Sequence, residues 1–315
     1  MTTGGGGPVE RRLRVLWNPT SGRKGGIPTN RASHQMLLDL LARHGLGDEL
    51  MVPASEEEAA QAARDAVTAG YDVVVAAGGD GTIGMVARQL LGTGTALGIL
   101  PLGSVMNIPR MLGIERQADD AARVLAEGHV RSIDVGQAGD RIFFEAASVG
   151  MHAAASRELP KVDHGDYGAL VRSFVAAVRY RSSVIRIELD GDRTVETEAL
   201  VVVVANGQFM GAGLPVAPDA SLDDGLFDVR VFLHHTKGEL AADLTALSSG
   251  HRPNEGRTLT ERARSVRITS TRPLPARADA VDLGTTPVAF EVRPSVLRVV
   301  APSGTGTPSR TSDTG

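Results

Sequence analysis

The chain has 315 residues, 42% of them hydrophobic and 22% charged, with a formal net charge of −4 and no cysteine. This length and composition fit a protein of two globular domains, and the negative charge argues against general nucleic-acid binding. The lack of thiols excludes disulfides and cysteine metal sites, which fits a reducing cytoplasm.

The first half of the chain alternates strand and helix patterns. A glycine-rich and then basic segment, residues 1–12, is expected to be a disordered arm. Short apolar runs then predict strands at residues 13–17, 50–53, 73–77 and 96–100. Helices are predicted at residues 36–41, 56–69 and 85–91, the second with Ser55 as its N-cap. This alternation indicates an α/β domain over residues 13–138, built on a doubly wound parallel sheet that binds its ligand at the carboxyl ends of the strands.

Two glycine-rich loops follow predicted strands of this sheet. The first is polar and runs through residues 18–26, and the second is Gly78-Gly79-Asp80-Gly81-Thr82. At a strand-to-helix junction, backbone N–H groups and the helix dipole favour an anion, and glycine lets a ligand approach closely. Asp80 stands out, because a bare carboxylate repels phosphate unless it holds a metal or takes a proton. The loops therefore suggest phosphoryl transfer, with a plain glycine turn and a solvated Asp80 as the alternative.

The second half, residues 139–302, is rich in β-strand patterns. Strands are predicted at residues 142–144, 183–189, 200–205, 227–232, 265–269, 289–292 and 297–300, and one helix at residues 167–180. This pattern indicates a largely antiparallel β-sandwich domain. The tail, residues 303–315, contains only Gly, Ser, Thr, Pro and charged residues and is expected to be disordered.

Membrane contact is expected to be peripheral, because no run approaches the roughly 20 apolar residues that cross a bilayer. Arg172, Arg179 and Arg181 lie in or near the helix predicted at residues 167–180. They could dock on anionic lipid headgroups, although a solvated face is the ordinary interpretation of such a group.

Seven motifs stand in a characteristic order along the chain. They are Asn18-Pro19-Thr20-Ser21-Gly22, Gly78-Gly79-Asp80-Gly81-Thr82, Leu100-Pro101-Leu102-Gly103-Ser104, Ser132-Ile133-Asp134-Val135-Gly136, Asn206-Gly207, Ala217-Pro218 and Asp223-Asp224-Gly225. Together they resemble the diacylglycerol kinase catalytic family, which includes bacterial lipid kinases and sphingosine kinases, over residues 14–302. The resemblance implies an N-terminal domain that holds ATP, a C-terminal β-sandwich domain, a cleft between them for a lipid hydroxyl, and magnesium.

Matching the family position by position gives candidate site residues. The residues expected to contact the nucleotide are Asn18, Ser21, Gly22, Lys24, Ser55, Gly78, Gly79, Gly81, Thr82, Ser104 and Asn107. Ser104 stands where the family usually has a threonine, and Lys24 could equally be solvated. Asp80 and Asp134 match acids of the active site, and Asp279 is expected to help Asp80 orient or deprotonate the acceptor hydroxyl.

A structural magnesium site is also implied by the resemblance. Its expected ligands are Ser221, Asp224 and the backbone of Leu226. Such a set makes physical sense, because a hard cation takes oxygen ligands and accepts backbone carbonyls. An acidic turn is the alternative interpretation of this segment.

Some positions of the implied site depart from the family. Val281 replaces the glutamate taken as the base for the acceptor hydroxyl, and Asp282 lies one residue further on. Val105-Met106-Asn107 occupies the position of the family's Gly-Asn-Asp segment, and Gly84-Met85 occupies that of its Asn-Glu pair. General-base help contributes typically about 10² to 10⁴ in rate. Since phosphoryl transfer draws most of its catalysis from positioning and charge neutralisation, losing the glutamate is expected to slow such an enzyme without necessarily silencing it.

The function expected from these motifs is an ATP-dependent lipid kinase that phosphorylates a lipid hydroxyl such as that of diacylglycerol or a sphingoid base. Two alternatives stay open: a nucleotide-binding family member with little or no turnover, and an NAD-kinase-like enzyme, which the later motifs disfavour. ATP and Mg²⁺ are the expected cofactors. The expected partner is a lipid substrate at a membrane surface, met by a cytoplasmic, peripherally associated protein; a homodimer is left open, and nucleic acid is not expected.

Overall fold

The computed structural model describes residues 11–24, 27–28, 32–158, 166, 168–233, 236, 238–240, 242, 245 and 258–303. Its contacts divide the chain into two compact units. The first unit lies within Met1–Gly22, Asn30–Ser132 and Val296–Gly315, and the second within Arg23–Thr29 and Ile133–Ser295. Most of the predicted arm and tail, residues 1–10 and 304–315, lies outside the described residues.

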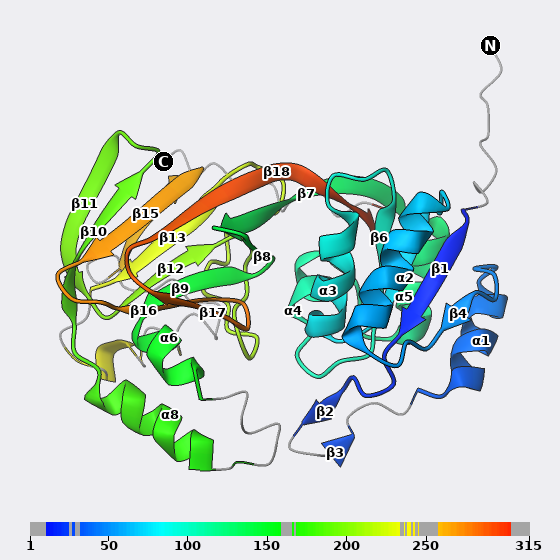
Figure 1. Ribbon diagram of the computed structural model, residues 1–315, viewed down its shortest axis with the longest axis horizontal. Coiled ribbons are helices and arrows are strands. Elements are labelled where there is room, and N and C mark those ends of the chain that lie inside the picture. Colours follow the sequence, from blue (N-terminus) through cyan, green and yellow to red (C-terminus); the bar gives the residue numbers. More distant parts are fainter. Residues whose placement is uncertain are drawn as a thin grey trace, which may run out of the picture. The chain divides into compact units, whose positions relative to one another are not determined.

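Strands and helices alternate along the first unit (Figure 1). They are β1 (Leu13–Trp17), α1 (His34–Arg43), β4 (Leu50–Met51), α2 (Glu56–Thr68), β5 (Val73–Gly78), α3 (Asp80–Leu90), β6 (Ala96–Pro101), α4 (Asn107–Met111) and α5 (Ala118–Glu127). Strands β1, β5 and β6 begin at the residues that the apolar runs predict, whereas β4 is two residues long instead of the four expected.

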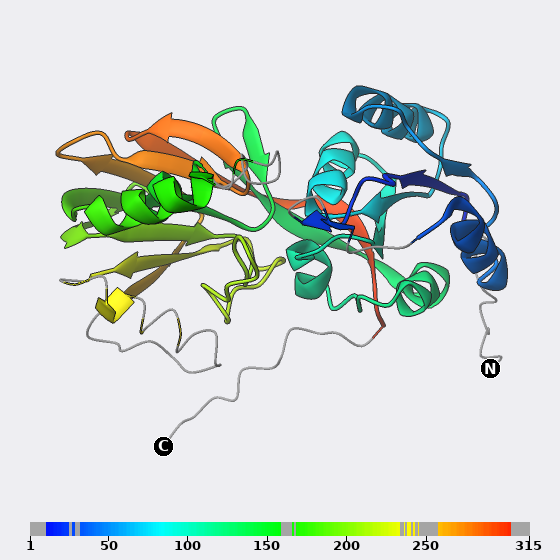
Figure 2. The same ribbon diagram turned by 90° about the horizontal axis from the view of Figure 1, so that it is seen from below.

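The sheet of the first unit has the strand order β18-β6-β5-β1-β4, with β18 spanning Val288–Ala301. All four pairings in it are parallel. Figure 2 shows α2 and α3 on one face of this sheet and α1 and α5 on the other. The predicted doubly wound parallel sheet is thus confirmed, and its topological switch point, where such sheets bind ligands, lies between β1 and β5.

Helix α3 starts earlier than the sequence suggests. It begins at Asp80, five residues before the predicted start at Met85, so that Asp80, Gly81 and Thr82 form its first turn. Gly81 and Gly84 are poor helix formers, which is why the segment has the pattern of a turn. Packing overrides this preference, because Ile83 and Gly84 are buried.

The second unit is mainly β-structure. Its elements are β2 (Arg23–Lys24), β3 (Ile27–Pro28), β8 (Arg141–Phe143), β9 (Ala146–Gly150), α6 (Met151–Ser156), α8 (Gly168–Arg179), β10 (Ser183–Leu189), β11 (Arg193–Ala199), β12 (Val201–Ala205), β13 (Phe227–Phe232), β14 (Thr258–Ala263), β15 (Ser265–Ser270), β16 (Pro275–Ala278) and β17 (Val281–Thr285). One sheet has the order β11-β10-β15-β18, and the other the order β14-β13-β12-β9-β16-β17. The pairings along both orders are antiparallel, which confirms the predicted β-sandwich.

Phenylalanines from three strands meet in the core of the sandwich. The ring of Phe143 stacks on that of Phe227 at 5.7 Å between centroids and meets Phe290 edge-on at 6.1 Å. Strand β12 is buried at all five positions. Its alternate side chains, such as Val202 and Val203, enter two different hydrophobic clusters. This explains why an antiparallel strand is continuously apolar, a pattern usual for strands covered on both faces.

Two strands belong to both units. Strand β7 (His129–Ala138) leads from the first unit into the second, and β18 leads back. The two strands predicted at residues 289–292 and 297–300 are one continuous strand, β18, whose last residues pair with β6 of the first unit at Val299. The compact units therefore differ from the predicted domain limits of residues 13–138 and 139–302.

Among the residues that the structure describes, no helix combines the length and apolar character needed to cross a bilayer.

Candidate functional site

The loops that follow β1 and β5 are joined by a small hydrogen-bond network at the carboxyl ends of these strands. Asn18 donates from Nδ2 to the hydroxyl of Thr82 at 3.1 Å, and the Ser21 hydroxyl lies 3.3 Å from the same atom. The backbone N–H of Gly79 donates to the Ser21 hydroxyl at 3.3 Å. Four of the predicted nucleotide contacts therefore lie together at the switch point of the sheet.

Glycine is required where these loops approach one another. A Cβ built on Gly103 would lie 2.5 Å from the Cα of Gly79, and one on Gly78 would lie 2.7 Å from the Thr82 side chain. Neither position can hold a larger residue without movement of the backbone or of Thr82. By contrast, a Cβ on Gly81 meets nothing within 4 Å. The first turn of α3 thus has open space on the side where Gly81 lies.

Asp80 is held by the start of helix α4. Its Oδ2 accepts backbone N–H groups of Met106 at 2.8 Å and Asn107 at 3.1 Å, and its Oδ1 accepts that of Ile108 at 3.0 Å. These N–H groups belong to the N-terminal end of a helix, where donors lack partners inside the helix. The carboxylate therefore caps α4 and ties the β5–α3 loop to the β6–α4 loop.

Both oxygens of Asp80 accept hydrogen bonds from the protein, so the carboxylate positions the two loops. Three backbone N–H groups at the start of α4 thus face the Asp80 carboxyl and favour a negative charge there. The action of Asp80 as a base on the acceptor hydroxyl stays a prediction.

The remaining predicted nucleotide contacts have different surroundings. Asn107 is fully buried, is the first residue of α4 and donates its backbone N–H to Asp80. The backbone oxygen of Ser104 accepts a hydrogen bond from the Arg116 guanidinium at 3.0 Å. Arg116 lies outside the seven motifs, so the sequence analysis did not identify this contact. Ser55 caps α2 by accepting the N–H of Glu58 at 3.1 Å.

Two expected contacts lie at the end of the first loop. Gly22 has a positive φ of 79°, a conformation that favours glycine. Lys24 belongs to β2 in the second unit, and its side chain lies outside the part of the structure that is described.

Asp134 is a structural residue of the second unit. It is 2% exposed, its Oδ1 accepts the N–H of Ser295 and its Oδ2 that of Gly225, each at 2.7 Å. Asn206 adds a hydrogen bond from its amide to the backbone oxygen of Asp134 at 3.2 Å. These contacts join the turn at Gly225 to Ser295 of β18, and the predicted catalytic role of Asp134 stays a prediction.

Asp279 has the same kind of environment. Its two oxygens accept the N–H groups of Phe144 at 2.9 Å, Glu145 at 3.0 Å and Ala146 at 3.3 Å. It therefore fixes the start of β9, and its predicted role as a helper of Asp80 stays a prediction. Asp282 is paired with Arg157, whose hydrogen bonds lower the pKa of the carboxyl, so it is a poor replacement for the glutamate that Val281 displaces.

The predicted magnesium ligands do not form a cation site. The hydroxyl of Ser221 donates to Asp223 at 2.5 Å, and Asp224 accepts the N–H of Leu226 at 3.1 Å on one oxygen. The other oxygen of Asp224 is paired with Arg262. Arg262 also lies 3.7 Å from Asp228, its cross-strand neighbour. A guanidinium therefore supplies the positive charge of this turn, and the residues present do not fit a magnesium ion.

Within the described residues, no group of three or more His, Asp or Glu side chains is placed to hold a metal ion.

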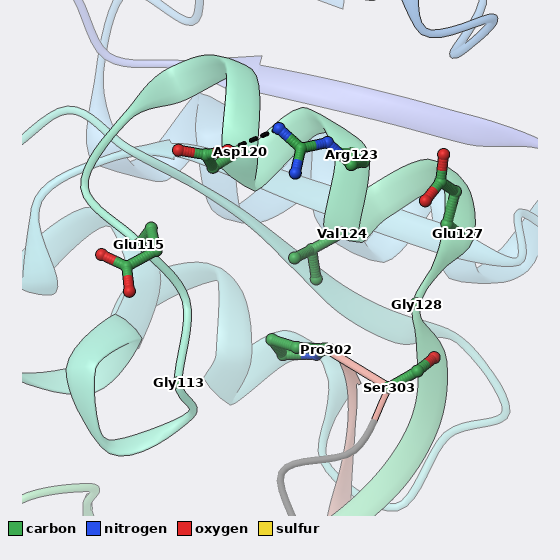
Figure 3. A pocket seen from close by; sticks show the side chains of 9 residues that line it. All are labelled: Gly113, Glu115, Asp120, Arg123, Val124, Glu127, Gly128, Pro302 and Ser303. Atoms are coloured by element: carbon green, nitrogen blue, oxygen red, sulfur yellow. Dashed lines mark hydrogen bonds and ion pairs between the residues drawn. The ribbon is translucent and has the colours of Figure 1, made fainter.

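A polar hollow of about 370 Å³ lies elsewhere on the first unit (Figure 3). Its lining contains three acids, Glu115, Asp120 and Glu127, and one cation, Arg123, which is paired with Asp120 at 2.5 Å. None of the predicted nucleotide contacts lines it. Because its lining is acidic, this hollow repels phosphate and is not the candidate site.

An apolar cavity of about 140 Å³ lies inside the second unit. It is lined by Met151, His152, Ala155, Val201, Val203, Met210, Leu214, Val216, Phe232 and Leu240. Burial lowers the pKa of His152 to about 4, helped by the charge of Arg277, so this imidazole is neutral near pH 7. Its Nδ1 lies 2.8 Å from the hydroxyl of Ser148. The cavity suits a hydrocarbon group, since a dry apolar cavity of similar size accepts a molecule as large as benzene.

Comparison with known proteins assigns both halves of the chain. A sequence profile described as diacylglycerol kinase catalytic domain matches residues 12–138. A second, described as YegS C-terminal NAD kinase beta sandwich-like domain, matches residues 146–301. The diacylglycerol kinase of Staphylococcus aureus (strain bovine RF122 / ET3-1) is 28% identical over 302 residues, which cover 94% of each chain.

Solved structures agree with this assignment in their fold. A crystal structure of a diacylglycerol kinase from Bacillus anthracis str. Sterne has a TM-score of 0.70 and 20% identity, covering 93% of this chain and 97% of that one. A second crystal structure from the same strain has a TM-score of 0.76 and 20% identity, covering 96% and 99%.

The role of Asp80 as a helix cap predicts a loss of stability when its charge is removed. In Asp80→Asn one acceptor becomes a donor that faces the N–H groups of α4, so the free energy of unfolding should fall by about 3 kcal/mol. Urea denaturation measures this change. Asp39→Asn, an exposed aspartate of α1, is the matched control and should change little. An Asp80→Asn protein as stable as the wild type would contradict the capping role.

The pairing of Arg262 with Asp224 predicts that the fold of the second unit does not depend on magnesium. The melting temperature of the wild type should be the same in EDTA and in millimolar Mg²⁺. Arg262→Gln leaves Asp224 and Asp228 without their cation, so it should melt lower and be partly restored by Mg²⁺. Arg267→Gln, an exposed arginine of β15, is the control. A wild type that EDTA destabilises would show that a metal is bound in spite of Arg262.

Proposed function

We propose, because this chain belongs to the diacylglycerol kinase catalytic-domain family, that it transfers the γ-phosphoryl group of ATP to the hydroxyl of a lipid such as diacylglycerol or a sphingoid base. The observation that carries this proposal is the meeting of three loops at one edge of the parallel sheet. These loops follow β1, β5 and β6, and they bring Asn18, Ser21, Gly79, Thr82 and Gly103 together.

The phosphates of ATP would lie at the N-terminus of helix α3. An eleven-residue helix begins there directly after a glycine N-cap that makes no side-chain cap. The first-turn N–H groups and the helix dipole of such an end favour an anion. The hydroxyls of Ser21 and Thr82 and the amide of Asn18 add polar groups at the same place.

The chemistry would rest on positioning. Asp80 holds the loops in register and is itself compensated by α4, so it does not repel the incoming phosphates. The acceptor hydroxyl oxygen attacks the γ-phosphorus, the bond to the β–γ bridging oxygen breaks with ADP as the leaving group, and the hydroxyl proton passes to solvent water. A loose transition state of this kind needs little help from a base, and because Val281 stands where the family has its glutamate, the enzyme would be slowed and still active. Magnesium would enter as the counterion of ATP and therefore as part of the substrate.

The acceptor would be a lipid at a cytoplasmic membrane surface, where ATP is present. The apolar cavity of the second unit supports this choice, because its lining offers no polar partner to a sugar or a nucleotide. The protein would act there in phospholipid metabolism as a peripherally bound enzyme.

A second candidate function is a nucleotide-binding protein with little or no turnover. The engagement of Asp80, Asp134 and Asp279 by backbone N–H groups favours it, because none of the three is free to take a proton from a substrate.

Labelled ATP with mixed micelles of lipid separates these functions. The proposal predicts a labelled phospholipid from diacylglycerol or from a sphingoid base, at a rate well below that of an enzyme that retains a general base. ATP that binds while no lipid is labelled would leave only the second candidate.

Gly81→Ala provides a variant that tests the position of the phosphates in the same assay. Its Cβ meets no protein atom within 4 Å, so the free energy of unfolding should not fall, and it should rise by up to about 1 kcal/mol because Ala is the better helix former. The methyl group occupies space at the first turn of α3, and the KM for ATP should rise about tenfold or more. Ala substitution at Gly94, far from the loops in sequence and also without a close contact, is the control. An unchanged KM for Gly81→Ala would place the phosphates elsewhere.

A further inference from the structure

Helix α8 exposes an apolar stripe. The side chains of Leu170, Val171, Phe174, Val175 and Val178 are 50%, 64%, 69%, 40% and 49% exposed. Their spacing follows the helical repeat, which places them along one side of the helix. Five of the nine large hydrophobic side chains exposed among the described residues thus lie on one helix of twelve residues.

The orientation of this helix is fixed by its other side. Ala169 and Ser173 are buried, and the hydroxyl of Ser173 donates to the backbone oxygen of Ala155 in α6 at 2.7 Å. At the start of the helix, Arg172 is paired with Glu158 and Asp166. The apolar stripe cannot turn inward without breaking these contacts, so its exposure is a property of the fold.

Cations accompany the stripe. Arg172 lies within the helix, Arg179 in its last turn and Arg181 two residues beyond, and all three are exposed. The helix contains no acidic residue. This arrangement differs from the whole chain, whose net charge is −4. An apolar face flanked by arginines is typical of helices that lie in the interface of a membrane with anionic lipids.

We propose that α8 is the membrane-docking surface of this protein, with the apolar stripe inserted among lipid headgroups and Arg179 and Arg181 on anionic phosphates. The proposal deepens the proposed lipid kinase function and rests on it for the identity of the surface. A lipid bilayer is favoured over a second copy of the chain, because α8 contains no acidic residue, so the same helix of a second copy offers no carboxylate to Arg179 and Arg181 whereas an anionic lipid offers phosphates.

Helix α6 lies between the docking surface on α8 and the apolar cavity. Helix α6 packs against α8, and its residues Met151, His152 and Ala155 line the cavity. A bilayer bound at α8 would thus lie next to the element that forms one wall of the cavity. This placement would shorten the path of a hydrocarbon chain from the membrane to the protein.

Sedimentation with vesicles tests the proposal without ATP, so the result does not depend on turnover. The wild type should bind vesicles that contain phosphatidylglycerol more tightly than vesicles of phosphatidylcholine alone, and salt should weaken the binding. The double variant Val171→Ser/Phe174→Ser should bind vesicles at least about tenfold more weakly than the wild type, because it removes the two most exposed side chains of the stripe. Met36→Ser, on α1 and 58% exposed, is the matched control and should bind as the wild type does.

Equal binding of the double variant and the wild type would overturn the proposal, as would a wild type that binds neither vesicle. Light scattering adds a further test: a wild-type dimer that the double variant dissociates would assign the stripe to a second copy. Vesicle binding that depends on the stripe, without any labelled lipid in the kinase assay, would sustain the docking surface and refute the lipid kinase function. Labelled lipid without vesicle binding would do the reverse.

Discussion

The candidate site depends on the contact between the Asp80 carboxylate and three backbone N–H groups at the start of α4. This contact joins the loop after β5 to the loop after β6, and the two loops lie so close that a Cβ on Gly103 would come within 2.5 Å of the Cα of Gly79. A charged acceptor with several donors is among the stronger hydrogen-bonding arrangements in proteins. It also leaves the first turn of α3 without an uncompensated negative charge, which is the condition for an anion to approach.

Carboxylates that accept hydrogen bonds from several backbone N–H groups also occur in the second unit. Asp134 holds Gly225 and Ser295, and Asp279 holds the start of β9, in each case through backbone N–H groups. Asp80, Asp134 and Asp279 therefore each hold backbone segments together. Removal of such an acid is expected to act through stability as well as through chemistry. In the turn at Asp224, an arginine takes the place that the sequence assigns to a metal.

Much of the fold could be predicted from the sequence, because buried strands are continuously apolar and are therefore easy to recognise. The apolar run of β5 is buried at every position, and the strands of the sandwich are bounded by turn residues that are easy to recognise. The start of α3 and the continuity of β18 could not be predicted, since glycines in α3 and the proline of β18 signal breaks that tertiary packing overrides. The motifs also located Asn18, Ser21, Gly79 and Thr82 at one edge of the sheet, but the orientation of Asp80 depends on α4, whose five residues carry no helical pattern of their own.

Hydrogen–deuterium exchange with a non-hydrolysable ATP analogue tests most directly whether the edge formed by β1, β5 and β6 is a phosphate site. The account predicts that saturating nucleotide slows the exchange of the backbone N–H groups of residues 79–82 and of the loop at residues 102–106, while exchange in the acidic hollow around Glu115 stays unchanged. Protection confined to another part of the chain, or no protection at any concentration of nucleotide, would contradict it.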